Sequence, residues 1–146
     1  MSQNIIRVLL VDDHEMVRVG LATILNRSPH FEVVGEAGTC EEALEMAFRF
    51  LPDVIVMDIR MPGRSGIEAC RDILAAHPEI KVLMLTSYAD EEAVVASIIS
   101  GAKGYVLKKI GSRALIEAIM KVMQGESLID QDLLLKVMNR LQNERE

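Results

Sequence analysis

Residues 54–63 read VIVMDIRMPG, and the rest of the chain repeats the pattern that this stretch begins. Its first four residues are apolar and mostly β-branched, which predicts a fully buried strand at 54–57. Asp58 follows at once, and residues 61–63 predict a turn. A carboxylate at the end of a buried strand costs free energy to keep charged unless a cation meets it. Asp58 is therefore a candidate functional residue, although an aspartate that only caps the next turn would look the same.

An apolar strand followed by a helix occurs five times along the chain. The predicted strands are residues 5–11, 31–37, 54–57, 82–85 and 104–107. The predicted helices are residues 16–26, a second from the cap Thr39 to residue 50, a third from Ser65 to the stop at 77–78, a fourth from the cap Asp90 to residue 100, and a fifth from the cap Ser112 to Gly125. At the second helix, Thr39 and Glu42 have the spacing of a capping box.

Five strand–helix units with short connections predict a parallel sheet with helices on both faces. Strands buried on both faces are near-continuous apolar runs, and four of the five fit that description. Residues 31–37 mix polar with apolar residues, as an edge strand would. We therefore predict an α/β fold, a flavodoxin-like (βα)5 doubly wound parallel sheet with strand order 2-1-3-4-5.

A last amphipathic helix is predicted to begin at Asp130. Its apolar stripe consists of Leu134, Val137, Met138 and Leu141, which have the spacing of one helix face. Residues 142–146 are all polar. We therefore expect one domain over residues 4–125, and a linker or dimerisation helix with a polar tail over residues 126–146.

Composition excludes several classes of protein. The 146 residues are the size of one domain, and 50% of them are hydrophobic, so a sizeable core is available. A formal net charge of −6 argues against nonspecific affinity for nucleic acid or anionic membranes. No apolar run is long enough to span a bilayer, and residues 1–7 lack a signal-peptide pattern. Cys40 and Cys70 lack metal spacing and suit reduced thiols in a cytosolic protein.

Polar residues follow four of the five predicted strands. They are Asp12 and Asp13 after the first strand, Asp58 after the third, Thr86 after the fourth and Lys108 after the fifth. Because the first and third strands are neighbours in the predicted order, three carboxylates converge at the carboxyl edge of the sheet. Taken singly, each residue could be a helix cap or a solvated surface charge. Their common position after strands favours a site.

Three converging carboxylates repel one another, and a bound divalent cation would remove that repulsion. All-oxygen ligands in an acidic pocket suit Mg²⁺. The side chain of Lys108 is long enough to reach Asp58, and Thr86 supplies a hydroxyl at the same edge. A carboxylate beside a metal ion and an ammonium group can attack phosphorus and form an aspartyl phosphate.

Four segments, in this order, resemble the receiver domain of bacterial response regulators: VLLVDDHEMVR, DVIVMDIRMPGRSGIEA, VLMLTSY and GAKGYVLKK. The stretches HEMVRVGL and GAKGYVLK resemble the LuxR/NarL-type subfamily. The resemblance covers roughly residues 5 to 125. It implies a cytoplasmic phosphoacceptor switch of a two-component system, which receives its phosphoryl group from a sensor histidine kinase. It implies that the chain is not an enzyme, apart from Mg²⁺-dependent self-phosphorylation and slow autodephosphorylation.

The resemblance also assigns roles to the residues of the acidic pocket. Asp58 matches the phosphoacceptor, in front of the x-x-M-P-G turn. Asp12 and Asp13 match the pair that holds Mg²⁺, helped by Asp58 and by the backbone carbonyl of Arg60. In many receivers a proline follows the lysine through a cis bond; Lys109 stands there instead, and a cis bond to it would cost about 2.5–4 kcal/mol.

A further set of roles concerns the switch. Thr86 matches the hydroxyl that turns toward the phosphoryl group, and Lys108 matches the lysine that forms a salt bridge with it. Tyr105 matches the aromatic residue whose ring moves inward with the hydroxyl. From spacing alone, Tyr105 is a half-buried strand residue. The surface that changes as a result would be that of the fourth helix, fifth strand and fifth helix, or that of the first and fifth helices.

The resemblance extends to partners. We expect a homodimer on activation, no membrane contact, and control of transcription through a LuxR-type DNA-binding domain outside this chain. Residues 126–146 are too few for a DNA-binding bundle of about three helices, and they lack a basic stripe. We therefore expect this chain itself to bind no nucleic acid.

Three other interpretations remain open. A phosphohydrolase of the haloacid-dehalogenase type needs a second aspartate two residues after Asp58, where Arg60 stands. A flavin-binding module needs a phosphate loop after the first strand, where Asp12 and Asp13 would repel phosphate. A degenerate receiver, acting only as an interaction module, is disfavoured by the full set of site residues.

Overall fold

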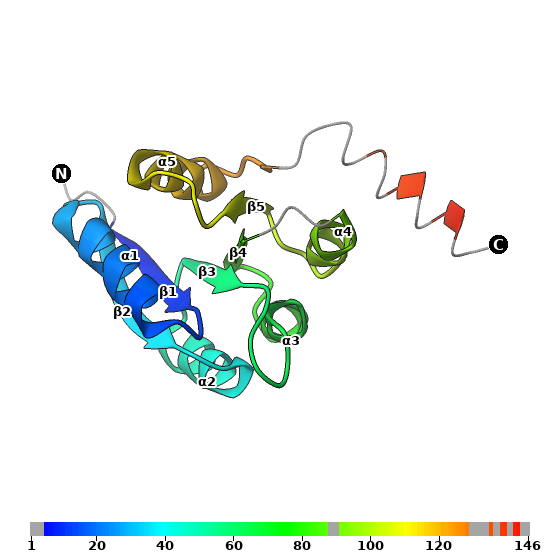
Figure 1. Ribbon diagram of the computed structural model, residues 1–146, viewed down its shortest axis with the longest axis horizontal. Helices are drawn as coiled ribbons and strands as arrows, with labels where there is room; N and C mark the ends of the chain where they lie inside the picture. Colours follow the sequence, from blue (N-terminus) through cyan, green and yellow to red (C-terminus); the bar gives the residue numbers. More distant parts are fainter. Residues whose placement is uncertain (1–4, 88–90, 129–134, 136–137, 140–141, 144–146) are drawn as a thin grey trace.

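The computed structural model describes residues 5–87, 91–128, 135, 138–139 and 142–143. Its elements are β1 (Ile6–Val11), α1 (Glu15–Arg27), β2 (Phe31–Ala37), α2 (Cys40–Phe50), β3 (Val54–Asp58), α3 (Gly66–Ala76), β4 (Lys81–Thr86), α4 (Glu91–Ile99), β5 (Gly104–Leu107) and α5 (Ser112–Met123). The strands form one parallel sheet in the order β2-β1-β3-β4-β5, which confirms the predicted fold (Figure 1). Among these helices, none has both the length and the hydropathy needed to cross a bilayer.

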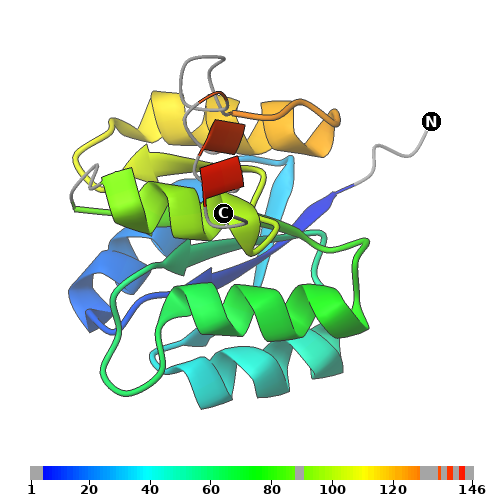
Figure 2. The same cartoon turned by 90° about the vertical axis from the view of Figure 1, so that its right-hand side faces the viewer.

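The sheet separates two apolar layers. Side chains alternate between the faces along a strand, so Val8 and Leu10 pack in one layer while Leu9 and Val11 pack in the other. Figure 1 shows α1 and α5 on the first face, and α2, α3 and α4, which stand in front of the sheet in Figure 2, on the second. All five residues of β3 are buried, as expected for a central strand covered on both sides.

The helix starts agree with the predicted caps in part. The third helix was predicted to start at Ser65; Ser65 is its N-cap, since its Oγ accepts the backbone N–H of Glu68 at 3.3 Å, and α3 begins at Gly66. Thr39 Oγ1 accepts the N–H of Glu42 at 3.1 Å. The predicted capping box is wrong in its second half, because the Glu42 carboxylate accepts the backbone N–H of Gly38 at 3.4 Å instead of that of Thr39.

At α5 the predicted cap is displaced by one residue. Gly111 is the N-cap, with an extended backbone, and its carbonyl accepts the N–H of Leu115 at 3.0 Å. Ser112 is therefore the first helical residue and not the cap. Glycine is also a favoured N-cap residue, which explains why serine is not needed there. The predicted cap Asp90 lies outside the described residues.

After α5 the chain returns to the edge of the sheet. Gly125 takes a left-handed conformation (φ 90°), and Leu128 then forms a parallel bridge with Gly104. The N–H of Leu128 donates to the carbonyl of Lys103 at 2.8 Å. The sequence did not predict this contact.

The predicted last helix falls largely outside the described residues. Its start at Asp130 and its stripe residues Leu134, Val137 and Leu141 are among those not described. Residues 135, 138–139 and 142–143 are helical, and Met138 is 57% exposed.

Candidate functional site

Asp58 is the last residue of β3 and is 3% exposed. Its Oδ2 accepts a hydrogen bond from Lys108 Nζ at 2.9 Å, and its Oδ1 accepts the backbone N–H of Arg60 at 3.2 Å. Lys108 directly follows β5, which is separated from β3 by β4 in the sheet. Its side chain therefore passes the end of β4 to reach Asp58, as the sequence predicted.

Gly66 fixes the backbone of Asp58. The N–H of Gly66 donates to the carbonyl of Ile59 at 2.8 Å, so the first turn of α3 lies against the end of β3. A Cβ atom at position 66 would lie 2.1 Å from the carbonyl oxygen of Asp58. Only glycine allows this close approach, and it holds the functional carboxylate in a defined position.

Asp12 joins the same cluster from the end of β1. Its side chain is 2% exposed, and its Oδ1 accepts the backbone N–H of His14 at 2.8 Å. Its Oδ2 lies 3.0 Å from Lys108 Nζ, so one ammonium group bridges Asp12 and Asp58. The predicted convergence of the carboxyl ends of β1 and β3 is present in the structure.

Asp13 and His14 complete the cluster on its solvent side. His14 Nδ1 lies 3.0 Å from Asp12 Oδ1 and 3.2 Å from Asp13 Oδ1. One potential ligand atom from each of Asp12, Asp13, His14 and Asp58 lies within 4.8 Å of the others. His14 was not among the predicted site residues. Its position directly after the acidic pair was the available signal.

The charges of the pocket act on Asp58 in opposite directions. Burial raises the pKa of the Asp58 carboxyl above its ordinary value, and the charge of Asp12 raises it further. The hydrogen bonds from Lys108 and from the Arg60 amide lower that pKa, but the net direction is upward. The protonated form of Asp58 is therefore favoured more than in water, mainly because the carboxyl group is buried.

Lys108 stays in its charged form. Burial alone would lower the pKa of its ammonium group, but the hydrogen bond and charge of Asp58 and those of Asp12 outweigh burial, and the net direction is upward. A charged Lys108 between two buried carboxylates is the arrangement that favours a charge-assisted hydrogen bond.

The residues fit a hard divalent cation. Asp12 Oδ2 is buried, and the ammonium group of Lys108, 3.0 Å away, is shared between this oxygen and Asp58. Carboxylate oxygens from three residues are the donors that Mg²⁺ prefers. The acidic cluster is of the kind that holds a metal ion.

Thr86 and Tyr105 lie on the side of the sheet covered by α3 and α4. Thr86 ends β4 and is 3% exposed, and its carbonyl accepts the N–H of Lys108 at 2.7 Å. Tyr105 pairs with Met84 in the sheet and packs in the same layer as Met84. Alternation along β4 places the side chain of Thr86 on that face too. Tyr105 is half-buried, as its spacing predicted.

Arg60 and Lys109 are the remaining site positions. The side chain of Arg60 is exposed, and its backbone N–H, not its carbonyl, contacts Asp58. The role of the Arg60 carbonyl as a metal ligand stays a prediction. The described peptide bonds are all trans, so the bond from Lys108 to Lys109 is trans.

Comparisons with known proteins agree with this geometry. Residues 8–120 match the family described as response regulator receiver domain. The chain is 43% identical over 141 residues to the DNA-binding transcriptional activator DevR/DosR of Mycobacterium tuberculosis, covering 97% of this chain and 65% of that protein. It is 41% identical over 148 residues to the transcriptional regulatory protein DegU of Brevibacillus brevis, covering 99% of this chain and 63% of that protein.

A solved structure gives the same result. A two-component response regulator of the LuxR family from Aurantimonas sp. SI85-9A1 has a TM-score of 0.83 with this chain at 31% identity, covering 94% of this chain and 98% of that one. By contrast, the chain spans less than two thirds of the length of the two curated relatives named above.

Proposed function

The chain belongs to the response regulator receiver domain family, and from that premise we propose that Asp58 accepts a phosphoryl group from a sensor histidine kinase. The family is one of phosphoacceptor switches in two-component signalling rather than of catalytic enzymes. One observation carries the assignment to Asp58: a single ammonium group, that of Lys108, lies 2.9 Å from Asp58 Oδ2 and 3.0 Å from Asp12 Oδ2.

In the transfer step, an oxygen of the Asp58 carboxylate attacks the phosphorus of a phosphohistidine on the kinase. The new O–P bond forms as the P–N bond breaks, and the histidine nitrogen leaves with the electron pair. Lys108 orients the carboxylate before the transfer and can then donate to an oxygen of the phosphoryl group. Because its pKa is raised, it brings a full positive charge to the dianion.

The proposed metal ligands are Asp12, Asp13, Asp58 and the carbonyl of Arg60. When bound there, Mg²⁺ would supply positive charge to the oxygens of the transferred group. The chain's own contribution is to hold the carboxylates close together. The convergence of one potential ligand atom from each of Asp12, Asp13 and Asp58 within 4.8 Å of one another supports this assignment.

Phosphorylation would change the conformation of the domain through Thr86 and Tyr105. A new dianion at Asp58 attracts the Thr86 hydroxyl and the Lys108 ammonium group. The backbones of these two residues are joined by a hydrogen bond of 2.7 Å, so the ends of β4 and β5 would move together. Tyr105 packs in the same layer as Met84 and would follow when the Thr86 side chain turns inward.

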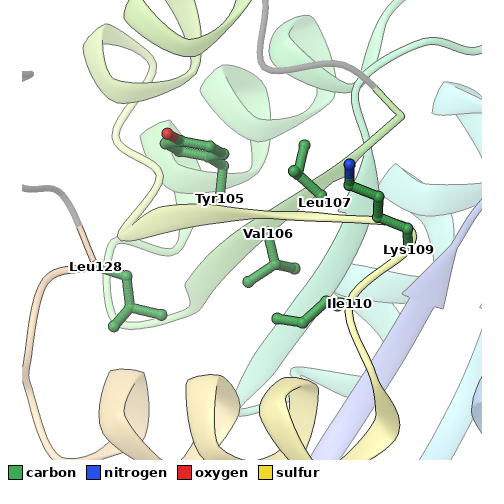
Figure 3. Close-up of a pocket in the computed structure, with 6 residues that line it drawn as sticks. All are labelled: Tyr105, Val106, Leu107, Lys109, Ile110 and Leu128. Carbon is green, nitrogen blue, oxygen red and sulfur yellow. The ribbon is translucent and has the colours of Figure 1, made fainter.

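We further propose that residues 126–146 form the linker that carries the signal out of the domain, with residues 4–125 as the receiver. Leu128 is held by its bridge to Gly104 at the start of β5. It also lines a cavity of about 520 Å³ together with Tyr105, Val106 and Ile110. In Figure 3, Val106, Ile110 and Leu128 lie on one side of β5 and Tyr105 on the other. Movement of Tyr105 would therefore change the wall of a cavity that Leu128 also lines.

The experiment that tests the phosphoacceptor uses Mg²⁺ and acetyl phosphate, with intact mass as the readout. Wild type should gain one acid-stable, base-labile phosphoryl adduct, and Asp58→Asn should gain none. Asp53→Asn is the matched control, because Asp53 lies just before the same strand at the opposite end of the sheet, where it accepts the N–H of Arg7 at 2.9 Å. An undiminished adduct on Asp58→Asn refutes the proposal. Turnover of added phosphate esters would indicate a hydrolase instead.

The output is proposed from the relatives. The two curated relatives are named as transcription regulators, so we propose a cytoplasmic regulator whose DNA contacts come from a domain outside this chain. Buried free thiols at Cys40 and Cys70 agree with a reducing compartment.

We also propose that activation produces a homodimer, through α4, β5 and α5 or through α1 and α5. Exposed apolar side chains occur on both faces: Ile99 on α4 is 51% exposed, and Val19 on α1 is 51% exposed. Light scattering with and without beryllofluoride tests the dimer, and Ile99→Asp and Val19→Asp distinguish the faces. A monomer under both conditions excludes self-association of this chain on activation.

A further inference from the structure

We propose that Arg18 is a positioning residue for phosphoryl transfer, because it holds the turn that carries Asp12 and Asp13 against the end of β2. Arg18 lies in α1, one turn after the N-cap His14, and is not one of the residues that form the acidic cluster. The inference rests on the proposed function, since it concerns how the proposed metal ligands are held in place. It assigns a role to a side chain that acts through the main chain of Asp12.

The guanidinium group of Arg18 bonds the main chain of Asp12 and not its carboxylate. Arg18 Nη1 donates to the carbonyl oxygen of Asp12. That carbonyl belongs to the peptide unit that joins Asp12 to Asp13, and a peptide unit is planar and rigid. The hydrogen bond therefore limits rotation of this unit and fixes where Asp13 begins. The Asp12 carboxylate is left to the amide of His14 and the ammonium group of Lys108.

A second contact anchors the guanidinium group itself. Arg18 Nε lies 3.4 Å from Glu36 Oε1, and Glu36 is the residue before the last in β2. The Arg18 side chain is 19% exposed, so the ion pair is partly shielded from solvent. Because β2 pairs with β1 in the sheet, Arg18 ties the turn after β1 to the neighbouring strand.

Gly38 leaves the space that the guanidinium group occupies. A Cβ atom at position 38 would lie 3.1 Å from Arg18 Nη1, so the guanidinium group would have to shift. The residue before Gly38 is Ala37, whose carbonyl accepts the N–H of Asp12 at 2.9 Å. Both polar groups of the Asp12 main chain are therefore held from the β2 side, the N–H by Ala37 and the carbonyl by Arg18.

The two contacts of Arg18 suit arginine better than lysine. A planar guanidinium group donates in fixed, different directions, so Nη1 can bond a carbonyl while Nε faces a carboxylate. The ammonium group of lysine is a compact charge on a flexible stem, and it would keep the charge without holding both partners at set angles. Substitution can therefore separate the charge of Arg18 from its geometry.

Loss of position and loss of charge have opposite effects on cation binding. Removal of a positive charge near three carboxylates would by itself strengthen the attraction of Mg²⁺. Release of the turn would let Asp12 and Asp13 leave the spacing that a shared ion needs, which weakens binding. Groups that hold metal ligands in place typically contribute about 10–100-fold to affinity. The positioning role therefore predicts weaker Mg²⁺ binding in Arg18→Ala, against the sign of the charge effect.

Hydrogen–deuterium exchange followed by NMR in chelator tests the tether without metal or phosphate. The His14 amide donates to Asp12 Oδ1 at 2.8 Å and so reports the position of that carboxylate. In Arg18→Ala, the amides of Asp12 and His14 should exchange about tenfold faster, because the turn opens locally. The amide of Lys81, which donates to Asp53 at 3.2 Å at the opposite edge of the sheet, should be unchanged. Equal acceleration of all three amides, or of none, overturns the proposal.

Titration calorimetry tests the consequence for the pocket on the full chain. Arg18→Ala should bind Mg²⁺ about tenfold more weakly than wild type, and Arg18→Lys should remain weaker than wild type. Arg27→Ala is the matched control, because it removes the same charge from an exposed position in the last turn of α1 and should leave the affinity unchanged.

Two calorimetric results would overturn the positioning role. Mg²⁺ binding that is unchanged or tighter in Arg18→Ala would show that the turn keeps its place without the tether. Full recovery in Arg18→Lys would show that charge alone is needed. Neither exchange nor calorimetry requires phosphorylation, so failure of the phosphoacceptor assignment at Asp58 and failure of this proposal are distinguishable.

Discussion

The acidic pocket and the outer edge of β5 are built in opposite ways. The pocket gathers charged side chains from the ends of β1, β3 and β5, and its key contacts are ion pairs such as that of Lys108 with Asp58. The edge is built from backbone and apolar contacts, with Leu128 bridging Gly104 beside a cavity of about 520 Å³. The charged residues of the pocket can be recognised in the sequence. The contacts at the edge depend on how the backbone and apolar side chains fit together, which the sequence does not show directly.

A single short strand joins the two regions. β5 begins at Gly104, which contacts Leu128, and ends at Leu107, next to Lys108. A signal from Asp58 therefore has to cross only β5 to reach the segment after α5. The comparison predicts that substitutions can disrupt either region without the other. A substitution in β5 or next to it should leave phosphorylation of Asp58 intact but prevent the conformational change from reaching the segment after α5.

The largest expected effect breaks the pocket and leaves the edge intact. Gly66→Ala places a Cβ atom 2.1 Å from the carbonyl oxygen of Asp58, so the end of β3 or the start of α3 must move. We expect a loss of about 3 kcal/mol in the free energy of unfolding, at the upper end of overpacking costs, together with slower phosphorylation. Urea denaturation measures the first and intact mass the second.

Gly20→Ala is the control for Gly66→Ala. A Cβ atom at position 20 meets no atom within 4 Å, and the residue lies inside α1. Alanine should stabilise that helix by about 0.5–1 kcal/mol. If Gly66→Ala were as stable as wild type and equally reactive, the close approach of α3 to Asp58 would have no importance.

Metal addition should stabilise the pocket. A cation that binds only the folded state adds about 2.7 kcal/mol at a concentration of one hundred times its dissociation constant. Saturating Mg²⁺ should therefore raise the melting temperature of wild type, and the rise should be much smaller in Asp12→Asn. Calorimetric melting with Mg²⁺ and with chelator measures the difference. Equal rises in both proteins would show that the ion binds elsewhere.

The edge is broken by Gly104→Ala. The added Cβ atom would lie 2.5 Å from the Leu128 Cβ atom, so the segment after α5 or the start of β5 must shift. We expect a cost of about 1–2 kcal/mol and unchanged phosphorylation of Asp58. Adding Leu128→Gly should recover part of the stability, and a double-mutant cycle measures this coupling. Additive losses would contradict the contact.

The smallest effect concerns the charge of Asp58. Its pKa in the folded state is above the ordinary value of 3.8, so the folded state binds the proton more tightly than the unfolded state. Stability therefore falls as pH rises from about 3.8 through the folded pKa, and the loss remains at neutral pH. In chelator at pH 7, Asp58→Asn should therefore melt at a higher temperature than wild type, as a calorimetric scan would measure. A lower melting temperature would contradict the sign.

The sheet order and the pocket could be predicted because they follow from general rules. Five strand–helix units allow few topologies, and the polar residues after β1, β3, β4 and β5 then meet at one edge. Asp12, Asp58 and Lys108 were placed correctly by this reasoning alone. Boundaries were accurate where a side chain marked them, as Ser65 does for α3.

Other features left no clear signal in the sequence. Gly111 caps α5 through its backbone, and Gly38 receives the Glu42 carboxylate, so neither role is visible in a side chain. The contact of Leu128 with β5 depends on the absence of a side chain at Gly104. An amphipathic pattern predicts which face of a helix is buried, but it does not predict which strand an extended segment contacts.

The central claim is that the pocket and the edge form one switch through β5. Hydrogen–deuterium exchange of the Leu128 amide, which donates to Lys103, tests it most directly. With Mg²⁺ and beryllofluoride, exchange of this amide should become at least tenfold faster in wild type and stay unchanged in Asp58→Asn. Exchange that is unchanged in wild type, with Asp58 fully occupied, would contradict the claim.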